Sequence, residues 1–168
     1  IVAAAIIVFK ADVQLTSLYG IFGIYELPAV ASYSLSIFTI LVIINAFNLI
    51  DGINGLSGSI ATLISVILGI WFIMTGNTVM SIIAFSLAGA VFAFLKYNFT
   101  PAQIFMGDTG ALLIGLVCSI LAIQFIESNK LLPDANPYKL NAVPAVAIGI
   151  LILPLFDTLR VFVTRALK

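Results

Sequence analysis

Four polar side chains interrupt a long apolar stretch of the sequence. Asn45, Asn48, Asp51 and Asn54 are spaced three residues apart. On an α-helix the first three of them share a face about 120° wide, and two nearby glycines would let another group approach the backbone. A carboxylate in or beside hydrocarbon is costly, so this group is a candidate functional site. The alternative is a polar helix end that contacts only lipid headgroups and water.

A second polar group surrounds Asp108, at the expected start of a later helix. Its side chain could simply cap that helix. The functional interpretation is that Gly107 and Gly110 allow close backbone approach, that the helix N-terminus favours a phosphate, and that Asp108 holds a metal ion. Alternating helices bring Asp51 to the same membrane face, with Lys96 nearby. Two carboxylates suit Mg²⁺ and a diphosphate, because Mg²⁺ completes its octahedron with water and phosphate oxygens.

A third polar stripe lies near the end of the sequence. Asp157, Arg160 and Thr164 follow one another at steps of three and four residues. Asp157 and Arg160 could form an intrahelical ion pair of small energetic value. The other interpretation is that these side chains pair across to the site formed by the first two groups.

Composition places all three groups in a membrane protein. The 168 residues are 62% hydrophobic and 8% charged, and the mean hydropathy is +1.26, whereas soluble domains are about 25% charged. Long continuous apolar runs predict an all-α, polytopic transmembrane bundle in a single integral membrane domain, residues 1–168. Zero net charge gives no basic surface for nucleic acid. Without His, and with Cys118 alone, the chain has neither an internal disulfide nor a Cys/His zinc cluster, so Cys118 is expected to be a packing residue.

The apolar runs predict one partial and about five full spans. In order they are residues 1–9 (partial), 33–50, 58–74, 79–95, 109–126 and 142–164. Pro144 and Pro154 are expected to bend the last span. Gly76 and Asn77 are expected to form a tight turn.

Strict alternation of these helices sorts the connections into two sets. The first set comprises residues 45–55, 96–108 and the C-terminal end, and the second comprises 10–32, 76–77 and 127–141. Four basic residues on the first side against three on the second make the first side cytoplasmic by the positive-inside rule. Aromatic residues of the second side suit a membrane interface; they are Tyr19, Phe22 and Tyr25.

These segments resemble the polyprenyl-phosphate N-acetylhexosamine-1-phosphate transferases. That family includes the bacterial undecaprenyl-phosphate GlcNAc-1-phosphate transferases and, more distantly, the phospho-MurNAc-pentapeptide translocase. Two signatures carry the resemblance: residues 45–58, NAFNLIDGINGLSG, and residues 105–111, FMGDTGA. Three further segments resemble the GlcNAc-type branch: YGIFGIYELP at 19–28, KYNFTPA at 96–102 and DTLRV at 157–161.

The resemblance implies a Mg²⁺-dependent phosphotransferase, with Mn²⁺ as a substitute. It would transfer a HexNAc-1-phosphate, most readily GlcNAc-1-phosphate, from a UDP-sugar to undecaprenyl or another polyprenyl phosphate and release UMP. This is the first membrane step of cell-envelope glycan synthesis, such as lipopolysaccharide or teichoic acid. The expected location is the bacterial inner (cytoplasmic) membrane, with the site facing the cytoplasm. The expected partners are the UDP-N-acetylhexosamine, the polyprenyl phosphate, the bilayer and, in a homodimer, a second copy.

The resemblance also assigns roles to residues. Asp108 is expected to bind the metal, and Asp51 to be a second ligand, an organiser or the group that activates the lipid phosphate. Direct attack by the lipid and a covalent enzyme intermediate both remain open. Asn54 stands where the family often has Asp, and Gln103 where Lys is common. Expected substrate-binding residues are Asn45, Asn48, Asn54, Lys96, Asn98, Gly107, Thr109, Gly110 and Arg160.

Two family motifs, a paired Asp and a His-containing loop, would lie before residue 1 and after Lys168. We therefore expect the sequence to be a fragment that is inactive alone. The competing hypothesis is a transporter or channel whose broken helices surround an ion. Both polar clusters fall near one membrane face and not at the midplane, which favours the enzyme.

Overall fold

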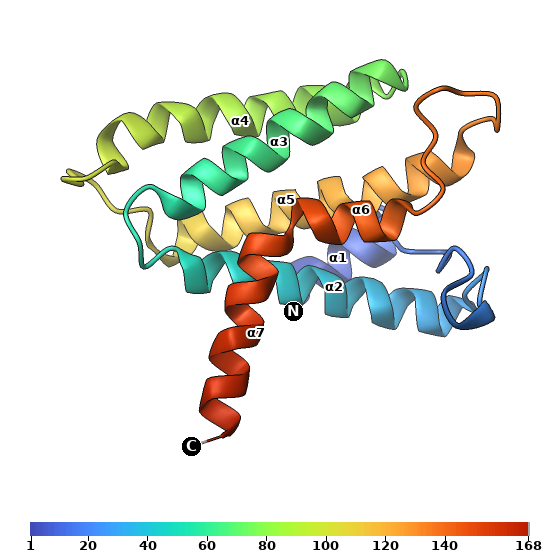
Figure 1. Ribbon diagram of the computed structural model, residues 1–168, viewed down its shortest axis with the longest axis horizontal. Coiled ribbons are helices and arrows are strands. Elements are labelled where there is room, and N and C mark those ends of the chain that lie inside the picture. Colours follow the sequence, from blue (N-terminus) through green and yellow to red (C-terminus); the bar gives the residue numbers. More distant parts are fainter. Residues whose placement is uncertain (168) are drawn as a thin grey trace.

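The apolar stretches of the sequence form the long helices of a bundle (Figure 1). The computed structural model describes residues 1–167. In chain order the helices are α1 Val2–Lys10, the 3₁₀ helix η1 Ile21–Gly23, α2 Ala29–Ile50, α3 Leu56–Met74, α4 Thr78–Asn98, α5 Gly107–Leu131, α6 Val143–Ile150 and α7 Ile152–Ala166. An isolated antiparallel bridge joins Ser17 to Glu26 at the base of a hairpin.

Helices α2 to α5 are each long and apolar enough to cross a membrane, and α6 with α7 would make a fifth span if the bent pair counts as one. The predicted polytopic helical bundle is confirmed. The α2–α3 and α4–α5 connections lie at one end of the bundle, and the connections around residues 11–28, 75–77 and 132–142 lie at the other (Figure 1). Alternation of these spans, and the tight turn at Gly76, are therefore as predicted.

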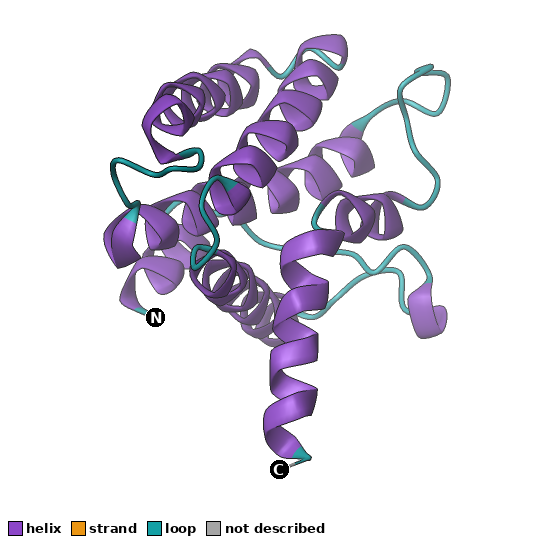
Figure 2. Cartoon of the chain, turned by 60° about the vertical axis from the view of Figure 1, so that its left-hand side comes forward, coloured by secondary structure: helices purple, strands orange, loops and turns teal. Residues whose placement is uncertain are grey.

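The last predicted span, 142–164, is two helices that meet at an angle of 74°. Pro144 does not bend it, since this residue lies in the first turn of α6, where a missing N–H costs nothing. The break comes at Leu151, because Pro154 has no N–H to bond the carbonyl of Ile150 and its ring crowds that turn. As a result α7 leaves the bundle, as both views show (Figures 1 and 2).

Small residues let the two central helices, α2 and α5, approach closely. A Cβ atom added at Gly115 would lie 2.7 Å from the Cα atom of Ile44, so backbone meets backbone at this point. Close approach through small residues is the usual way in which membrane helices gain packing energy. Cys118, one turn further along α5, is fully buried, as expected of a packing residue. The helices that end in Asp51 and begin beside Asp108 are thus firmly joined.

Candidate functional site

The end of α2 and the start of α5 bring the two predicted carboxylates to one end of the bundle. Asp51 caps the C-terminus of α2, and Asp108 lies in the first turn of α5. The side-chain amide of Asn48 donates a hydrogen bond to Oδ1 of Asp108 at 3.3 Å. Asp108 is exposed, and the N-cap position belongs to Met106. The structure therefore does not use Asp108 as the helix N-cap, which was the alternative to a functional role.

The Asp51 carboxylate is held by a serine that the sequence analysis did not single out. The hydroxyl of Ser57 donates a hydrogen bond to Oδ1 of Asp51 at 2.6 Å. Ser57 is buried in the first turn of α3, and its Oγ lies 3.9 Å from the sulfur of Met106. The hydrogen bond from this hydroxyl fixes the orientation of the Asp51 carboxylate.

Asn98 connects the two loops of the site. It is 4% exposed at the end of α4. Its Oδ1 accepts a hydrogen bond from the backbone N–H of Gly55 at 2.7 Å, and its Nδ2 donates to the carbonyl of Ile104 at 2.9 Å. Gly55 has φ +77°, and a Cβ atom there would lie 3.3 Å from the Phe99 ring. In the structure Asn98 is a positioning residue for both loops, and contact with substrate stays a prediction.

Replacing Asn98 with Ala is expected to release the loop at residues 99–106, because the carbonyl of Ile104 loses its donor. It is also expected to destabilise the protein by about 1–3 kcal/mol, because the buried N–H of Gly55 loses its acceptor. The measurements are thermal unfolding in detergent and protease cleavage of the folded protein. Asn77→Ala is the matched control: it removes a helix-capping amide that accepts from the N–H of Met80 at the opposite end. Equal protease resistance of this loop in both variants would contradict the role given to Asn98.

Three other predicted site residues are exposed at this end of the bundle, and the contacts of two of them are with their own helices. Asn45 is exposed and donates to the carbonyl of Leu41 on its own helix at 2.7 Å. Asn54 is exposed in the α2–α3 loop. Lys96 is exposed at the end of α4, with its ammonium 5.5 Å from the centroid of the Tyr97 ring.

The first turn of α5 presents Gly107 and Thr109 to the outside, and Gly107 has φ +69°. Gly110 is covered by Met106, because a Cβ atom at Gly110 would lie 2.5 Å from the Cγ atom of that side chain. This glycine therefore lets the preceding loop fold back over the helix start. Contact of Gly110 with substrate stays a prediction.

Two arrangements of Arg160 were considered from the sequence. The structure shows the first of them, an ion pair with Asp157 on the same helix. Its guanidinium lies 2.7 Å from Oδ1 of Asp157, one turn earlier in α7. Thr164 likewise bonds its own helix, donating to the carbonyl of Arg160 at 2.9 Å. This stripe lies on the helix that leaves the bundle, and a role of Arg160 toward substrate stays a prediction.

A groove of about 470 Å³ runs between α2 and α7. Its walls are largely apolar, with Phe38, Leu41, Val42, Leu49 and Phe162, and its polar lining residues are Asn45, Asn48, Thr158 and Arg165. Asn48 therefore faces both this groove and Asp108. The sequence analysis did not single out Arg165, which the structure places in the lining of this groove.

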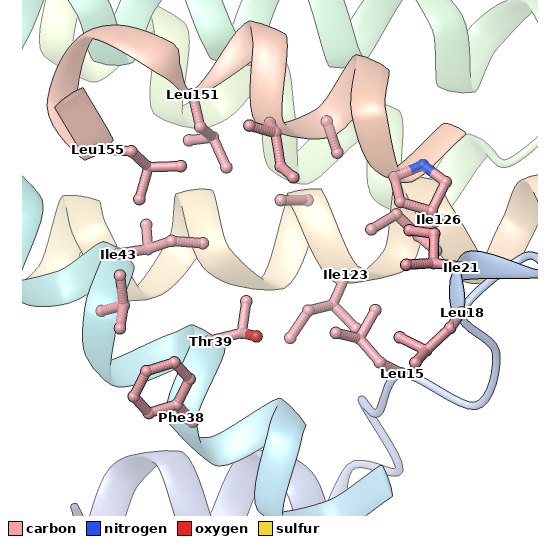
Figure 3. Close-up of a pocket in the computed structure, with 15 residues that line it drawn as sticks. Leu15, Leu18, Ile21, Phe38, Thr39, Ile43, Ile123, Ile126, Leu151 and Leu155 are labelled. Carbon is pink, nitrogen blue, oxygen red and sulfur yellow. The ribbon is translucent and has the colours of Figure 1, made fainter. Parts of the chain in front are cut away.

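An apolar hollow of about 300 Å³ follows the same face of α2 toward the other end of the bundle (Figure 3). Phe38 and Val42 line both spaces, so the hollow continues the groove. Figure 3 shows side chains of α2, α5, α6 and the 15–21 segment around it, among them Ile43, Ile123 and Leu151.

Asp51 and Asp108 carry the hard oxygen donors that Mg²⁺ prefers, and Mg²⁺ binding by them stays a prediction. Among residues 1–167 no group of three or more His, Cys, Asp or Glu side chains could hold a metal ion. The described residues therefore do not supply a full set of protein ligands for a metal ion. Mg²⁺ usually takes only one or two carboxylates and keeps positions for water and substrate phosphates. Asp51 and Asp108 are hard oxygen donors of this kind, each oriented by a neighbouring hydrogen-bond donor.

Comparison with known proteins identifies the family of this membrane protein. The sequence profile of the family described as "Glycosyl transferase family 4" matches residues 1–126. The chain belongs to this family, and the resemblance to polyprenyl-phosphate sugar-1-phosphate transferases is confirmed.

Similar curated proteins include phospho-N-acetylmuramoyl-pentapeptide-transferases. The one from Clostridium perfringens (strain 13) is 40% identical over 65 residues, which is 39% of this chain and 20% of the relative. That of Chlamydia caviae is 58% identical over 45 residues, 27% of this chain and 13% of the relative. That of Porphyromonas gingivalis is 45% identical over 58 residues, which is 34% of this chain and 14% of the relative. The matched stretches thus span a fifth or less of these three relatives.

Proposed function

We propose that this chain is part of a membrane enzyme that transfers a sugar-1-phosphate from a UDP-sugar to a polyprenyl phosphate and releases UMP. One observation carries the proposal: Asp51 and Asp108 lie at the same end of two closely packed membrane helices, and Asn48, which donates to Asp108, also lines a groove with apolar walls. A transferase of this kind must hold a water-soluble diphosphate and a lipid phosphate together. The arrangement offers a polar face for the first and an apolar path for the second.

Asp108 and Asp51 would hold Mg²⁺, or Mn²⁺ in its place, and the metal would neutralise charge on the diphosphate. Asn48 orients the Asp108 carboxylate, and Ser57 orients that of Asp51. The N–H groups at the start of α5, near Gly107 and Thr109, add the positive end of a helix dipole toward phosphate. The chain's own contribution is therefore orientation and charge stabilisation, with no requirement for a covalent intermediate.

The groove between α2 and α7 suits the lipid substrate. Its apolar walls, continued by the hollow in Figure 3, accommodate a prenyl chain, while Asn45, Asn48 and Arg165 offer donors to its phosphate. A phosphate monoester has its second pKa near about 6, so much of it is already a dianion at neutral pH. Attack by the lipid phosphate then needs no strong base, and the site faces the cytoplasm, where UDP-sugars are made.

The proposed sugar is GlcNAc, on the GlcNAc-type segments KYNFTPA and DTLRV. The curated relatives are named for a different donor, phospho-N-acetylmuramoyl-pentapeptide. The test therefore gives the full-length protein, in detergent with Mg²⁺ and undecaprenyl phosphate, either UDP-GlcNAc or UDP-MurNAc-pentapeptide labelled with ³²P in the β-phosphate.

Label in the lipid fraction and stoichiometric UMP are expected with UDP-GlcNAc. Transfer only from UDP-MurNAc-pentapeptide would keep the reaction class and change the sugar. Absence of transfer from both donors, by protein that is folded, would contradict the enzyme and favour the transporter, because a transporter does not cleave the UDP-sugar and so releases no UMP in detergent.

A further inference from the structure

An apolar hairpin tip stands at the edge of the molecule, at the end of the bundle opposite Asp51 and Asp108 (Figures 1 and 2). Six consecutive residues, 21–26, are exposed, and the first five, Ile-Phe-Gly-Ile-Tyr, carry no charge. Phe22 is 94% and Tyr25 is 71% exposed. A run of exposed apolar residues of this length is unfavourable in water unless something covers it.

The backbone of the tip holds these side chains outward in a fixed shape. Phe22 has φ +54°, which is unusual for a bulky residue, and it lies between Gly20 and Gly23, which also have positive φ. Strain of this kind persists only where the surroundings impose it, and it often marks a function. Here the strained residue is also one of the most exposed apolar residues, since Phe22 is 94% exposed.

The tip pairs several of its own backbone polar groups. Gly23 N–H donates to the carbonyl of Gly20 at 2.9 Å, and Gly20 N–H donates to that of Ile24 at 3.0 Å. Further down, Leu27 N–H donates to the carbonyl of Thr16 at 2.9 Å. In a lipid environment each unpaired backbone group is expensive, so internal pairing is a precondition for entering one.

The base of the hairpin is fixed to the end of α5. Glu127 accepts from both the N–H and the hydroxyl of Thr16, at 2.8 and 2.7 Å. The Tyr19 hydroxyl donates to the carbonyl of Ile126 at 2.8 Å, and burial raises the pKa of this phenol, which keeps the donor protonated. Lys130 lies 3.5 Å from Glu26, which puts an ion pair at the base and not at the tip.

We propose that residues 22–25, which follow the hollow-lining Ile21, insert into the interfacial layer of the lipid bilayer. The occupant is lipid, because the tip is uncharged, ends in aromatic rings that favour the headgroup boundary, and stands beside the start of the membrane-spanning helix α2. The apolar surface is continuous there, since Val30 in the first turn of α2 is 78% exposed. The hairpin is a rigid interfacial anchor that sets the depth and tilt of the bundle in the membrane. This proposal does not depend on the proposed reaction.

The test measures the depth of a tryptophan at the tip. Full-length protein whose native tryptophans, including Trp71, are replaced by Phe carries either Phe22→Trp or Tyr25→Trp and is reconstituted into phosphatidylcholine vesicles. Quenching by lipids brominated at shallow or deep acyl carbons is compared with quenching by aqueous acrylamide. Asp134→Trp, at a fully exposed side chain in a loop of the same end, is the water-exposed control. Phe92→Trp, 70% exposed on α4, is the acyl-chain control.

Both tip variants are expected to be quenched more by shallow than by deep bromines and several-fold less by acrylamide than the Asp134→Trp control. Acrylamide quenching equal to that control would overturn the proposal, because the tip would then lie in water. Protection from both quenchers would also overturn it, because protein would then cover the tip, either another part of the same chain or a second copy.

Discussion

Asp108→Asn is expected to lower sugar-phosphate transfer by about 10²-fold or more, the order of loss seen when one charge-stabilising group is removed from an active site. The amide keeps the shape of the side chain but loses the negative charge that a divalent cation requires. The residual rate is therefore also expected to need a higher Mg²⁺ concentration for half-maximal activity. The measurement is labelled transfer by the full-length enzyme across a Mg²⁺ titration.

The matched control is Asp134→Asn, a carboxylate at the opposite end of the bundle whose oxygen lies 2.7 Å from the ammonium of Lys139. Surface ion pairs of this kind contribute little, so its activity should stay at the wild-type level. Transfer by Asp108→Asn within about twofold of wild type would remove Asp108 from the metal site. The residue would then have only a local role at the start of α5.

Gly115→Val is expected to separate the two helices that carry the site. The added Cβ would lie 2.7 Å from Cα of Ile44 and 3.3 Å from its carbonyl oxygen, so no side-chain rotation relieves the clash and backbone must move. Overpacking costs about 1–3 kcal/mol or more, and about 2–4 °C of melting temperature per kcal/mol for a chain of this size. Gly115→Ala should show a smaller loss in the same direction. Thermal unfolding in detergent, followed by transfer activity below the transition, measures both effects.

Gly89→Ala provides the comparison. This glycine lies inside α4, and a Cβ atom added there has nothing within 4 Å. Removing a glycine from a helix interior favours the helix by about 0.5–1 kcal/mol, so this variant should melt at the same temperature or higher. Equal melting temperatures for Gly115→Val and Gly89→Ala would show that α2 and α5 are not in the contact described.

The helices and the location of the carboxylates follow from local pattern. Three-residue spacing predicted that Asn48 and Asp51 share a helix face, and the structure places them at the end of α2, with Asn48 in contact with Asp108. The alternation of spans was enough to predict that Asp51 and Asp108 lie at the same end. These predictions need only the periodicity of an α-helix and the length of helix that crosses a membrane. The spacing of the polar residues and the lengths of the apolar runs supply both.

What the sequence did not reveal depends on how loops pack. Ser57 is an ordinary residue whose contact with Asp51 depends on the shape of the α2–α3 loop. Asn98 was expected to bind substrate, and its positioning role appears only when the α2–α3 and α4–α5 loops lie side by side. The proline pair illustrates the same limit. A proline removes one hydrogen bond wherever it stands, but packing decides whether the helix starts there, as at Pro144, or breaks before it, as near Pro154.

The departure of α7 from the bundle has a consequence for how substrate concentration is defined. A ligand that enters between α2 and α7 arrives by diffusion in two dimensions, without leaving the bilayer, while a nucleotide arrives from bulk solution. For the lipid the relevant variable is its mole fraction in the membrane or micelle and not its molarity. An apparent KM for polyprenyl phosphate would therefore rise in proportion to added detergent, whereas the KM for the UDP-sugar would stay constant. Inhibitors that fill the groove would follow the same surface-dilution law.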